Sequence, residues 1–489
     1  MTLAALMMRI RNLKFWCVTV ALLAVAPAAC RASTVALVSG RATPDGRPLL
    51  MKQRDNAENP NQEFIYVHDV GYAYIGVTYT DVTDQIWGGI NEVGFCVINS
   101  NAWNLPDSVP GPDDDGYIMR QALLTCQTVA DFQIIMDSTN VTGRTRPANY
   151  GVIDASGDGA FFEAADYQYE VYDLNDSSAA PNGYMVRANF AYSGGSFHLG
   201  QHRHDRALEL LDWAYSGGFL THSYLTQSIQ RDLVNEQTNP YPLPFAGREG
   251  LLPYGLLRTH DALNREITRS GLVIQGILPG EDPHLTVLWA LVGEPISTVA
   301  LPLWVQAESV PPQFDSPGGA PLNIRAQEIR DYLYQQQYAQ DALDTWRLVD
   351  DRGLGELPFI TALENQAFAQ GDSALSVWRG SSIPAAAEVA SFQNAMAAGV
   401  YAQLVAWGPP QPPQLSLTWL PGSQVRLDWA PITQDVFGRP MTISAYTIYA
   451  SEDPLYNRAT GDSLTTVAAP PVTLGAPQSQ SYFQVRCRP

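Results

Sequence analysis

The stretch that decides the fold runs from Ser33 to Asn56 and reads STVALVSGRATPDGRPLLMKQRDN. Residues 34–38 are β-branched or apolar, and a turn built on Pro44, Asp45 and Gly46 follows them. Apolar residues resume at 48–51 on the far side of that turn. Two strand-like runs joined by a proline- and glycine-containing turn predict a β-hairpin.

The residues before this stretch have the pattern of a secretory signal. Arg9, Arg11 and Lys14 precede an apolar run over residues 15–26, and small residues follow it. We therefore expect residues 1–32 to be a signal peptide and the mature protein to be exported, either periplasmic or secreted. The run is too short for a membrane span, and no later stretch approaches about 20 uninterrupted apolar residues. The sequence predicts no transmembrane segment.

The cleavage site has alternatives. A cut before Ser33 leaves the small residues Cys30 and Ala32 at the usual positions and makes Ser33 the first mature residue. A cut after Ala28 would leave four residues ahead of Ser33. A lipid anchor on Cys30 fits less well, because Pro27 stands where a leucine-like residue is expected. Using Cys30 itself as a nucleophile would put three extra residues into the first strand.

Composition limits the class of partner. The chain has 489 residues, with 49 acidic and 29 basic side chains and a formal charge of −20. This balance argues against nucleic acid or an anionic membrane as a partner. Beyond Cys17 and Cys30, the cysteines are odd in number and widely spaced, which predicts neither a disulfide framework nor a metal site. Cys96 and Cys126 lie in apolar segments and are expected in the core.

The length favours two or three packed units. Strand-like and helical runs alternate up to residue 310, which predicts an α+β domain over 33–310. Residues 311–408 have helical spacing and are expected to form a helical extension. A proline-rich linker at 409–413 then leads to residues 414–489, whose strands and aromatic residues resemble a fibronectin type III β-sandwich. Contact with a surface or a polymer through this terminal β domain is one expectation.

Two further motifs follow the hairpin. Residues 87–101 read WGGINEVGFCVINSN, and residues 182–190 read NGYMVRANF. Taken alone, the asparagines of the first of these motifs, Asn91, Asn99 and Asn101, would be assigned to turns. In this order, however, the three motifs resemble the isopenicillin-N acyltransferase-like and choloylglycine-hydrolase-like families, which are N-terminal nucleophile (Ntn) hydrolases. The resemblance covers about residues 33–305.

The resemblance implies a fold and an activity. The fold is a four-layer αββα sandwich, with the mature N-terminus at the end of a strand and open to a cleft. The activity is hydrolysis of linear, non-peptide amide C–N bonds in a small acylated substrate. The first residue attacks with its side chain, and its own α-amine accepts the proton. With a second amine in place of water, the same site is an acyltransferase, and no cofactor or metal is required.

The resemblance also implies site residues. Ser33 takes the nucleophile position, where most relatives carry cysteine. Lys52 corresponds to a basic residue beside the nucleophile, and Asp55 to a carboxylate that binds the α-amine. Asn101 would contribute a backbone N–H to the oxyanion hole, and Asn189 would contribute its side chain. Arg203, at the start of a predicted helix, corresponds to an arginine that braces the site.

A different function is open at this point. Serine in place of cysteine also fits an inactive relative that binds an acylated ligand or a surface polymer. The two alternatives differ in one requirement, because catalysis needs a free α-amine on Ser33.

A histidine cluster at His198, His202 and His204 is expected to lie in a glycine-rich loop and not to bind metal. The sequence names neither the acyl group nor the oligomeric state.

Overall fold

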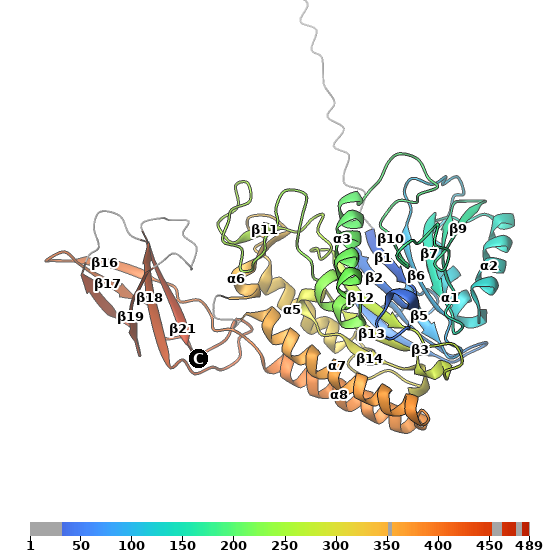
Figure 1. Cartoon of the computed structure of the whole chain (residues 1–489). Helices are drawn as coiled ribbons and strands as arrows, with labels where there is room; N and C mark the ends of the chain where they lie inside the picture. The colour runs from blue at the N-terminus through green and yellow to red at the C-terminus, as the bar shows by residue number, and fades with distance from the viewer. Residues whose placement is uncertain (1–31, 351–354, 452–461, 476–481, 489) are drawn as a thin grey trace, which may run out of the picture.

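The computed structural model describes residues 32–350, 355–451, 462–475 and 482–488 (Figure 1). The predicted signal peptide, with Cys17 and Cys30, lies outside the described residues, apart from Ala32. Within these ranges, none of the helices is both long and apolar enough to span a bilayer. The chain mixes helices and sheets, as the α+β prediction requires.

The predicted hairpin lies inside a six-stranded sheet, with a further strand on each side. Its strands β1 (Ala32–Val38) and β2 (Leu49–Asp55) pair antiparallel, with Ser33 opposite Arg54. The sheet has the order β10-β1-β2-β12-β13-β14. The other four strands are β10 (Tyr184–Arg187), β12 (Thr268–Gln275), β13 (Val287–Val292) and β14 (Leu301–Leu303).

A second, seven-stranded sheet follows the order of the chain from β3 to β9. Every neighbouring pair is antiparallel. The strands are β3 (Gln62–Val67), β4 (Tyr74–Tyr79), β5 (Gly88–Asn91), β6 (Cys96–Asn101), β7 (Ala148–Ile153), β8 (Gly159–Ala164) and β9 (Tyr169–Asp173).

Alternation along the hairpin explains how the sheets pack, because successive side chains in a strand point to opposite faces. Val35 and Leu37 lie in one hydrophobic cluster with Val97 of the second sheet. Ala36 and Val38 lie in another cluster with helix residues on the opposite face. The two sheets therefore face each other across β1 and β6, and the hairpin contributes to the core on both sides.

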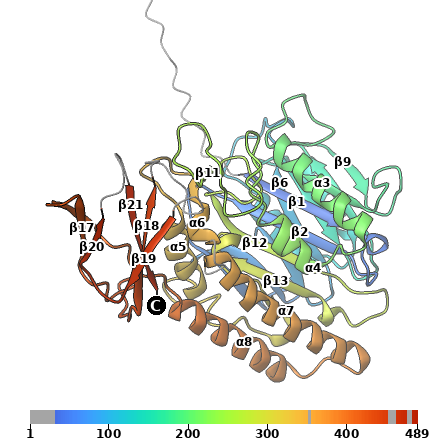
Figure 2. The same cartoon turned by 60° about the vertical axis from the view of Figure 1, so that its left-hand side comes forward.

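Helices cover both outer faces (Figures 1 and 2). Helices α1 (Asp115–Thr125) and α2 (Val129–Thr142) contact the seven-stranded sheet, while α3 (Gln201–Gly217) and α7 (Glu356–Gly380) contact the six-stranded sheet. The segment 311–408 also holds α5 (Pro321–Leu333), α6 (Thr345–Leu348) and α8 (Ala386–Ala406). A short β11–β15 pair (Leu256–Arg258 with Ala342–Asp344) joins this segment to the domain before it.

Two three-stranded sheets form the C-terminal unit, in the orders β16-β17-β20 and β19-β18-β21. They share a core that includes Val425, Trp429 and Ile448. The strands are β16 (Ser416–Leu420), β17 (Gln424–Asp428), β18 (Ala445–Ser451), β19 (Asp462–Val467), β20 (Val472–Gly475) and β21 (Tyr482–Arg488). Phe437 connects this unit to the helices, because the Arg325 guanidinium lies 4.0 Å above its ring.

His222 is a buried histidine beneath α7, and its burial predicts acid sensitivity. It begins the short helix α4 (His222–Tyr224) and stacks on Trp289 with the ring centroids 4.8 Å apart. Burial is the largest cause that lowers the pKa of His222 to about 4, with Asp45 opposing it and Arg379 adding to it. The folded protein therefore binds fewer protons than the unfolded chain between pH 4 and pH 6.5, so stability falls as the pH drops through that window.

We expect the free energy of unfolding to fall by about 2 to 3 kcal/mol more in the wild type than in His222→Phe between pH 7 and pH 4. Phenylalanine keeps the stacked ring and takes up no proton. Urea titrations of both proteins at the two pH values measure the difference. Equal losses in the two proteins would mean that His222 does not titrate in this range.

Candidate active site

Ser33 lies near the start of β1 and is 7% exposed. Its backbone N–H donates to Asn189 Oδ1 at 3.2 Å. Its hydroxyl donates to the carbonyl oxygen of the preceding residue, Ala32, at 2.6 Å. The predicted nucleophile is therefore buried, and residue 32 is its immediate polar neighbour.

Asn189 and Arg203 hold the main chain around Ser33. Arg203, in the first turn of α3, donates to Ser33 O at 2.9 Å, to Thr34 Oγ1 at 2.8 Å and to Asn189 Oδ1 at 2.7 Å. Asn189 Nδ2 donates to Asn101 O at 3.2 Å. Since an amide NH₂ carries two donors, one hydrogen of Asn189 is left for another acceptor. The predicted bracing arginine thus touches both the nucleophile residue and an oxyanion candidate.

Lys52 projects from β2 into the space between the sheets and is buried. Its Nζ donates to Asn99 Oδ1 at 2.5 Å, and Asn99 Nδ2 donates to Asp115 Oδ2 at 2.8 Å. Burial holds the pKa of Lys52 well below its usual range, and the Arg54 charge lowers it further, against Asp115 and Asp55. Burial also raises the pKa of Asp115. One bridging amide therefore separates a buried amine from a buried carboxyl group.

Asp55 projects from the opposite face of β2. Thr268 Oγ1 donates to its Oδ1 at 2.7 Å, and an Arg265 nitrogen lies 3.7 Å from its Oδ2. Burial raises the pKa of Asp55, while Arg265, Arg203 and the Thr268 bond lower it. Its Oδ2 accepts no hydrogen bond from the described residues, which leaves an acceptor for an amine.

These side chains share one cavity. The Ser33 hollow is small and is lined by Ala32, Ser33, Lys52, Arg54, Asp55, Asn56, Trp87, Asn99, Asn101, Asp113 and Asp115. Trp87 and Asp113 also line an adjoining, wider groove with Tyr79, Trp103 and Arg146. The structure therefore brings Ser33, Lys52, Asp55 and Asn101 together in one hollow, with Asn189 and Arg203 directly behind Ser33.

Sequence reasoning did not assign several residues of this hollow to the site, including Asn99, Asp115 and Arg54. Asn99 lies within a quoted motif, but only Asn101 was assigned there. Asp115 begins α1 and has no motif of its own. Arg54 stands between two predicted residues, and the period-two alternation of a strand would have placed it on the same face as Lys52.

Only part of the histidine cluster lies in a loop as expected: His198 precedes the helix α3. His202 and His204 lie in the first turn of α3, and His204 Nε2 is 2.7 Å from Tyr192 Oη. Gly200 precedes the helix with φ of 81°, a backbone conformation that glycine adopts readily, so the helix can begin at Gln201. In the part of the chain that the structure describes, no three His, Cys, Asp or Glu side chains are placed to hold a metal ion.

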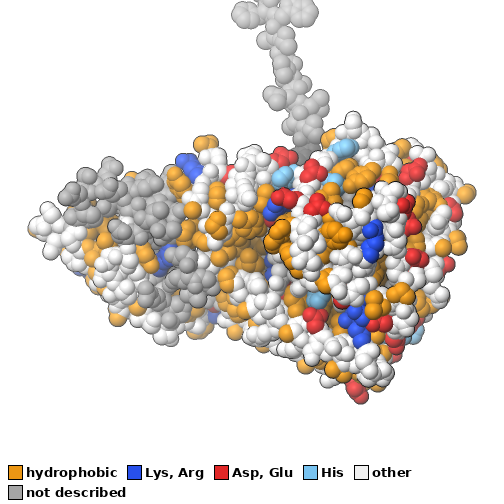
Figure 3. Space-filling model, in the orientation of Figure 1, with side chains coloured by type: hydrophobic (Ala, Val, Ile, Leu, Met, Phe, Trp, Pro, Cys, Tyr) orange, Lys and Arg blue, Asp and Glu red, His pale blue; other side chains and the backbone are white. Residues whose placement is uncertain are grey.

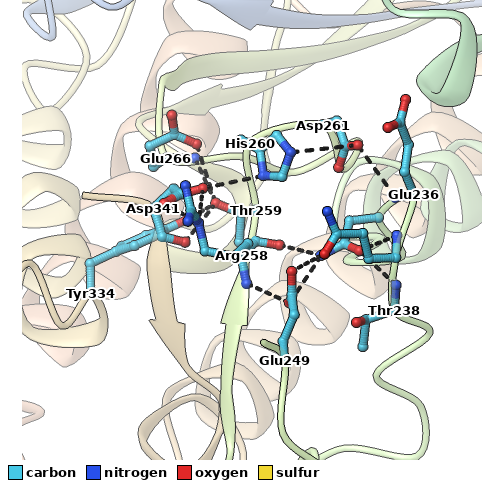
Figure 4. Close-up of polar contacts among 12 residues, drawn as sticks. Glu236, Thr238, Glu249, Arg258, Thr259, His260, Asp261, Glu266, Tyr334 and Asp341 are labelled. Atoms are coloured by element: carbon cyan, nitrogen blue, oxygen red, sulfur yellow. Dashed lines mark hydrogen bonds and ion pairs between the residues drawn. The ribbon is translucent and has the colours of Figure 1, made fainter. Parts of the chain in front are cut away.

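A second polar cluster lies beside β11 and β15 (Figure 4). Arg258 Nε donates to Asp341 Oδ2 at 2.7 Å, and His260 Nδ1 lies 3.3 Å from the same carboxylate oxygen. Glu249 accepts the Arg258 backbone N–H at 2.9 Å. These groups bind one another, so the cluster fixes the loops on this side of the fold.

On the face drawn in Figure 3, acidic side chains are dispersed and the basic groups are small and separate.

Comparison with known proteins gives distant likenesses only. No known family model matches the chain, and no curated protein matches its sequence. Among solved structures, it is similar to a variant of conjugated bile acid hydrolase from Clostridium perfringens, with 11% identity and a TM-score of 0.35 over 55% of this chain and 92% of that chain.

Two other solved structures are similar at the same level. Penicillin V acylase from Agrobacterium tumefaciens has 13% identity and a TM-score of 0.35 over 56% of this chain and 86% of that chain. Thermostable penicillin G acylase from Alcaligenes faecalis has 11% identity and a TM-score of 0.27 over 40% of this chain and 56% of that chain.

Proposed function

We propose that this chain is an Ntn-type hydrolase of linear, non-peptide amide C–N bonds, with Ser33 as its nucleophile. One observation carries the proposal: residues from three separate motifs converge on Ser33. Asn189 accepts the Ser33 N–H, Arg203 holds the Ser33 carbonyl, and Lys52, Asp55 and Asn101 line the hollow that Ser33 faces. Such a convergence of titratable and amide groups on a hydroxyl is what acyl transfer requires.

The architecture supports the same proposal. Two sheets face each other, helices cover both outer faces, and the strand that carries Ser33 is paired on both sides within its sheet. We assign this arrangement to the four-layer αββα sandwich of the Ntn class.

The two C-terminal sheets share one small core, which supports a fibronectin type III-like sandwich. Trp419, 66% exposed on that unit, is a candidate for contact with a surface or a polymer.

The proposed reaction starts when Ser33 Oγ attacks the amide carbonyl carbon and its proton passes to the free Ser33 α-amine. The side chain of Asn189 and the backbone N–H of Asn101 stabilise the resulting oxyanion. The C–N bond then breaks, the leaving nitrogen takes the proton from the α-ammonium, and an acyl-serine ester remains. Water activated by the same amine hydrolyses that ester, or a second amine takes the acyl group.

The mechanism requires that residues before Ser33 be removed. Ala32 continues β1, pairs with Asp55 and lines the same hollow. Cleavage of the bond between residues 32 and 33 would clear Ala32 from the hollow. It would also create an α-amine beside Asn189 Oδ1, in the same hollow as the unoccupied acceptor of Asp55.

The state of the N-terminus tests the proposal. We expect the exported protein to begin at Ser33, with an unmodified α-amine, because catalysis needs that amine. Intact mass spectrometry and N-terminal sequencing of the exported protein measure this directly. A start at Ala29, or a lipid on Cys30, would exclude the Ser33 mechanism and favour the ligand-binding alternative.

A further inference from the structure

Arg54 is a buried arginine beside the nucleophile. It stands opposite Ser33 in the β1–β2 ladder. Residues directly opposite in an antiparallel pair project from the same face, with Cβ atoms about 5 Å apart. Arg54 is 5% exposed and lines the Ser33 hollow. A group bound to its guanidinium would therefore lie only a few bonds from an amide held at Ser33.

The Arg54 side chain is held in place but is not neutralised. Its guanidinium carbon lies 4.6 Å from the ring centroid of Tyr79 and 4.5 Å from that of Trp87. One nitrogen donates to Gln62 Oε1 at 2.7 Å. A guanidinium has five N–H donors, so this bond uses one of them. Among the described residues, no carboxylate forms an ion pair with Arg54, and Gln62 is the one hydrogen-bond acceptor of its guanidinium.

The carboxylates that share the hollow are engaged elsewhere. Asp55 binds Thr268 and lies near Arg265, Asp113 accepts from Arg146 at 2.9 Å, and Asp115 accepts from Asn99. The second cation of the hollow, Lys52, bonds to an amide, and the Arg54 charge opposes its protonation. Two cations thus repel each other in a buried space, and an anion bound there would relieve the repulsion.

We infer that Arg54 binds a carboxylate of the substrate, so that the enzyme selects amides carrying a carboxylate a few atoms from the scissile C–N bond. This inference rests on the proposed function and names the substrate class of that site. The planar guanidinium fork matches a carboxylate, and contact with both rings together with the bond to Gln62 restricts how the fork is presented. Arg54 is thus a specificity-determining residue.

Matched pairs of amides test this assignment. Succinyl-p-nitroanilide and its methyl ester place the carboxylate on the acyl side, while N-benzoylglycine and its methyl ester place it on the amine side. In the pair whose carboxylate reaches Arg54, we expect kcat/KM of the wild-type mature protein to favour the acid by about 10- to 100-fold, the range of a charge-assisted hydrogen bond. The ratio should fall to about one in Arg54→Met and recover in part in Arg54→Lys.

The acid-to-ester ratio is taken within each variant, so a partial loss of folded protein cancels. Arg120→Met, an equivalent change at an arginine outside the hollow, should keep the wild-type ratio. If wild type turns over acid and ester equally in both pairs, and turnover is lost in Ser33→Ala, the Arg54 assignment is wrong and the hydrolase proposal stands.

Binding decides the case in which no probe is turned over. Calorimetry with Ser33→Ala protein and N-benzoylglycine then measures the anion site alone. Binding that is weaker for the methyl ester, and lost when Arg54→Met is added, would support the Arg54 site while the hydrolase proposal fails. Acid binding that does not depend on Arg54 would overturn the assignment.

Discussion

Replacing Ser33 with alanine should lower kcat/KM for any amide substrate by about a thousand-fold or more, because no other group of the hollow can form the acyl ester. Ser33→Cys should retain activity, since a thiol at the same position is a stronger nucleophile and serves the same α-amine base. Rates on a panel of chromogenic amides, measured for the three mature proteins, check this expectation.

Comparing these two variants with the wild type distinguishes loss of the nucleophile from loss of folded protein. Among the described residues, Ser33 Oγ forms one hydrogen bond, to Ala32 O, and that bond is lost when the peptide bond between residues 32 and 33 is cleaved and Ala32 leaves. Neither variant should therefore change the thermal midpoint of the mature protein appreciably. Mass spectrometry must show that each begins at residue 33, since an uncleaved protein would be inactive for another reason. Wild-type rates in a correctly cleaved Ser33→Ala protein would contradict the nucleophile assignment.

The local parts of the fold could be predicted from the sequence. The hairpin follows from the pattern of residues 33–56, because turn chemistry and strand propensity act over neighbouring residues. The order of strands in the sheets has no such local signal. Residues 296–303 illustrate the limit, because their apolar pattern predicts a single strand. Pro295 instead begins a short 3₁₀ turn, and only Leu301–Leu303 forms a strand, at the sheet edge where Pro302 is tolerated.

The residues of the candidate site could likewise be predicted only where they lie in local motifs. Ser33, Asp55 and Asn189 lie in contiguous motifs, and the structure brings them together. The bond from Lys52 to Asn99 crosses between the two sheets, so it depends on how those sheets pack. Asp115 enters the hollow because α1 packs on β6, which no pattern around residue 115 specifies. The residues that no local motif indicates are therefore brought into the hollow by long-range packing.

Asn189 provides the second large effect, and the choice of substitution matters. Alanine would leave Ser33 N, Arg203 and Asn101 O without their partner, so it would disturb the fold as well as the reaction. Aspartate has nearly the same shape and keeps the oxygen that accepts from Ser33 N and Arg203, but it lacks the NH₂ group and loses the bond to Asn101 O. We expect Asn189→Asp to lower kcat by about 100- to 1,000-fold, the usual effect of losing one oxyanion donor, with a smaller change in KM.

The pH dependence of Asn189→Asp must be measured alongside the rate. A carboxylate beside the α-amine stabilises its protonated form and raises its pKa, so less of the free base is present at neutral pH. This alone would lower the rate at pH 7 and could be mistaken for a lost oxyanion donor. The informative quantity is therefore kcat on the alkaline plateau, where the amine is neutral in both proteins. A plateau within about three-fold of wild type would mean that the Asn101 N–H stabilises the oxyanion without Asn189, whereas a loss that persists on the plateau assigns the donor to the Asn189 side chain.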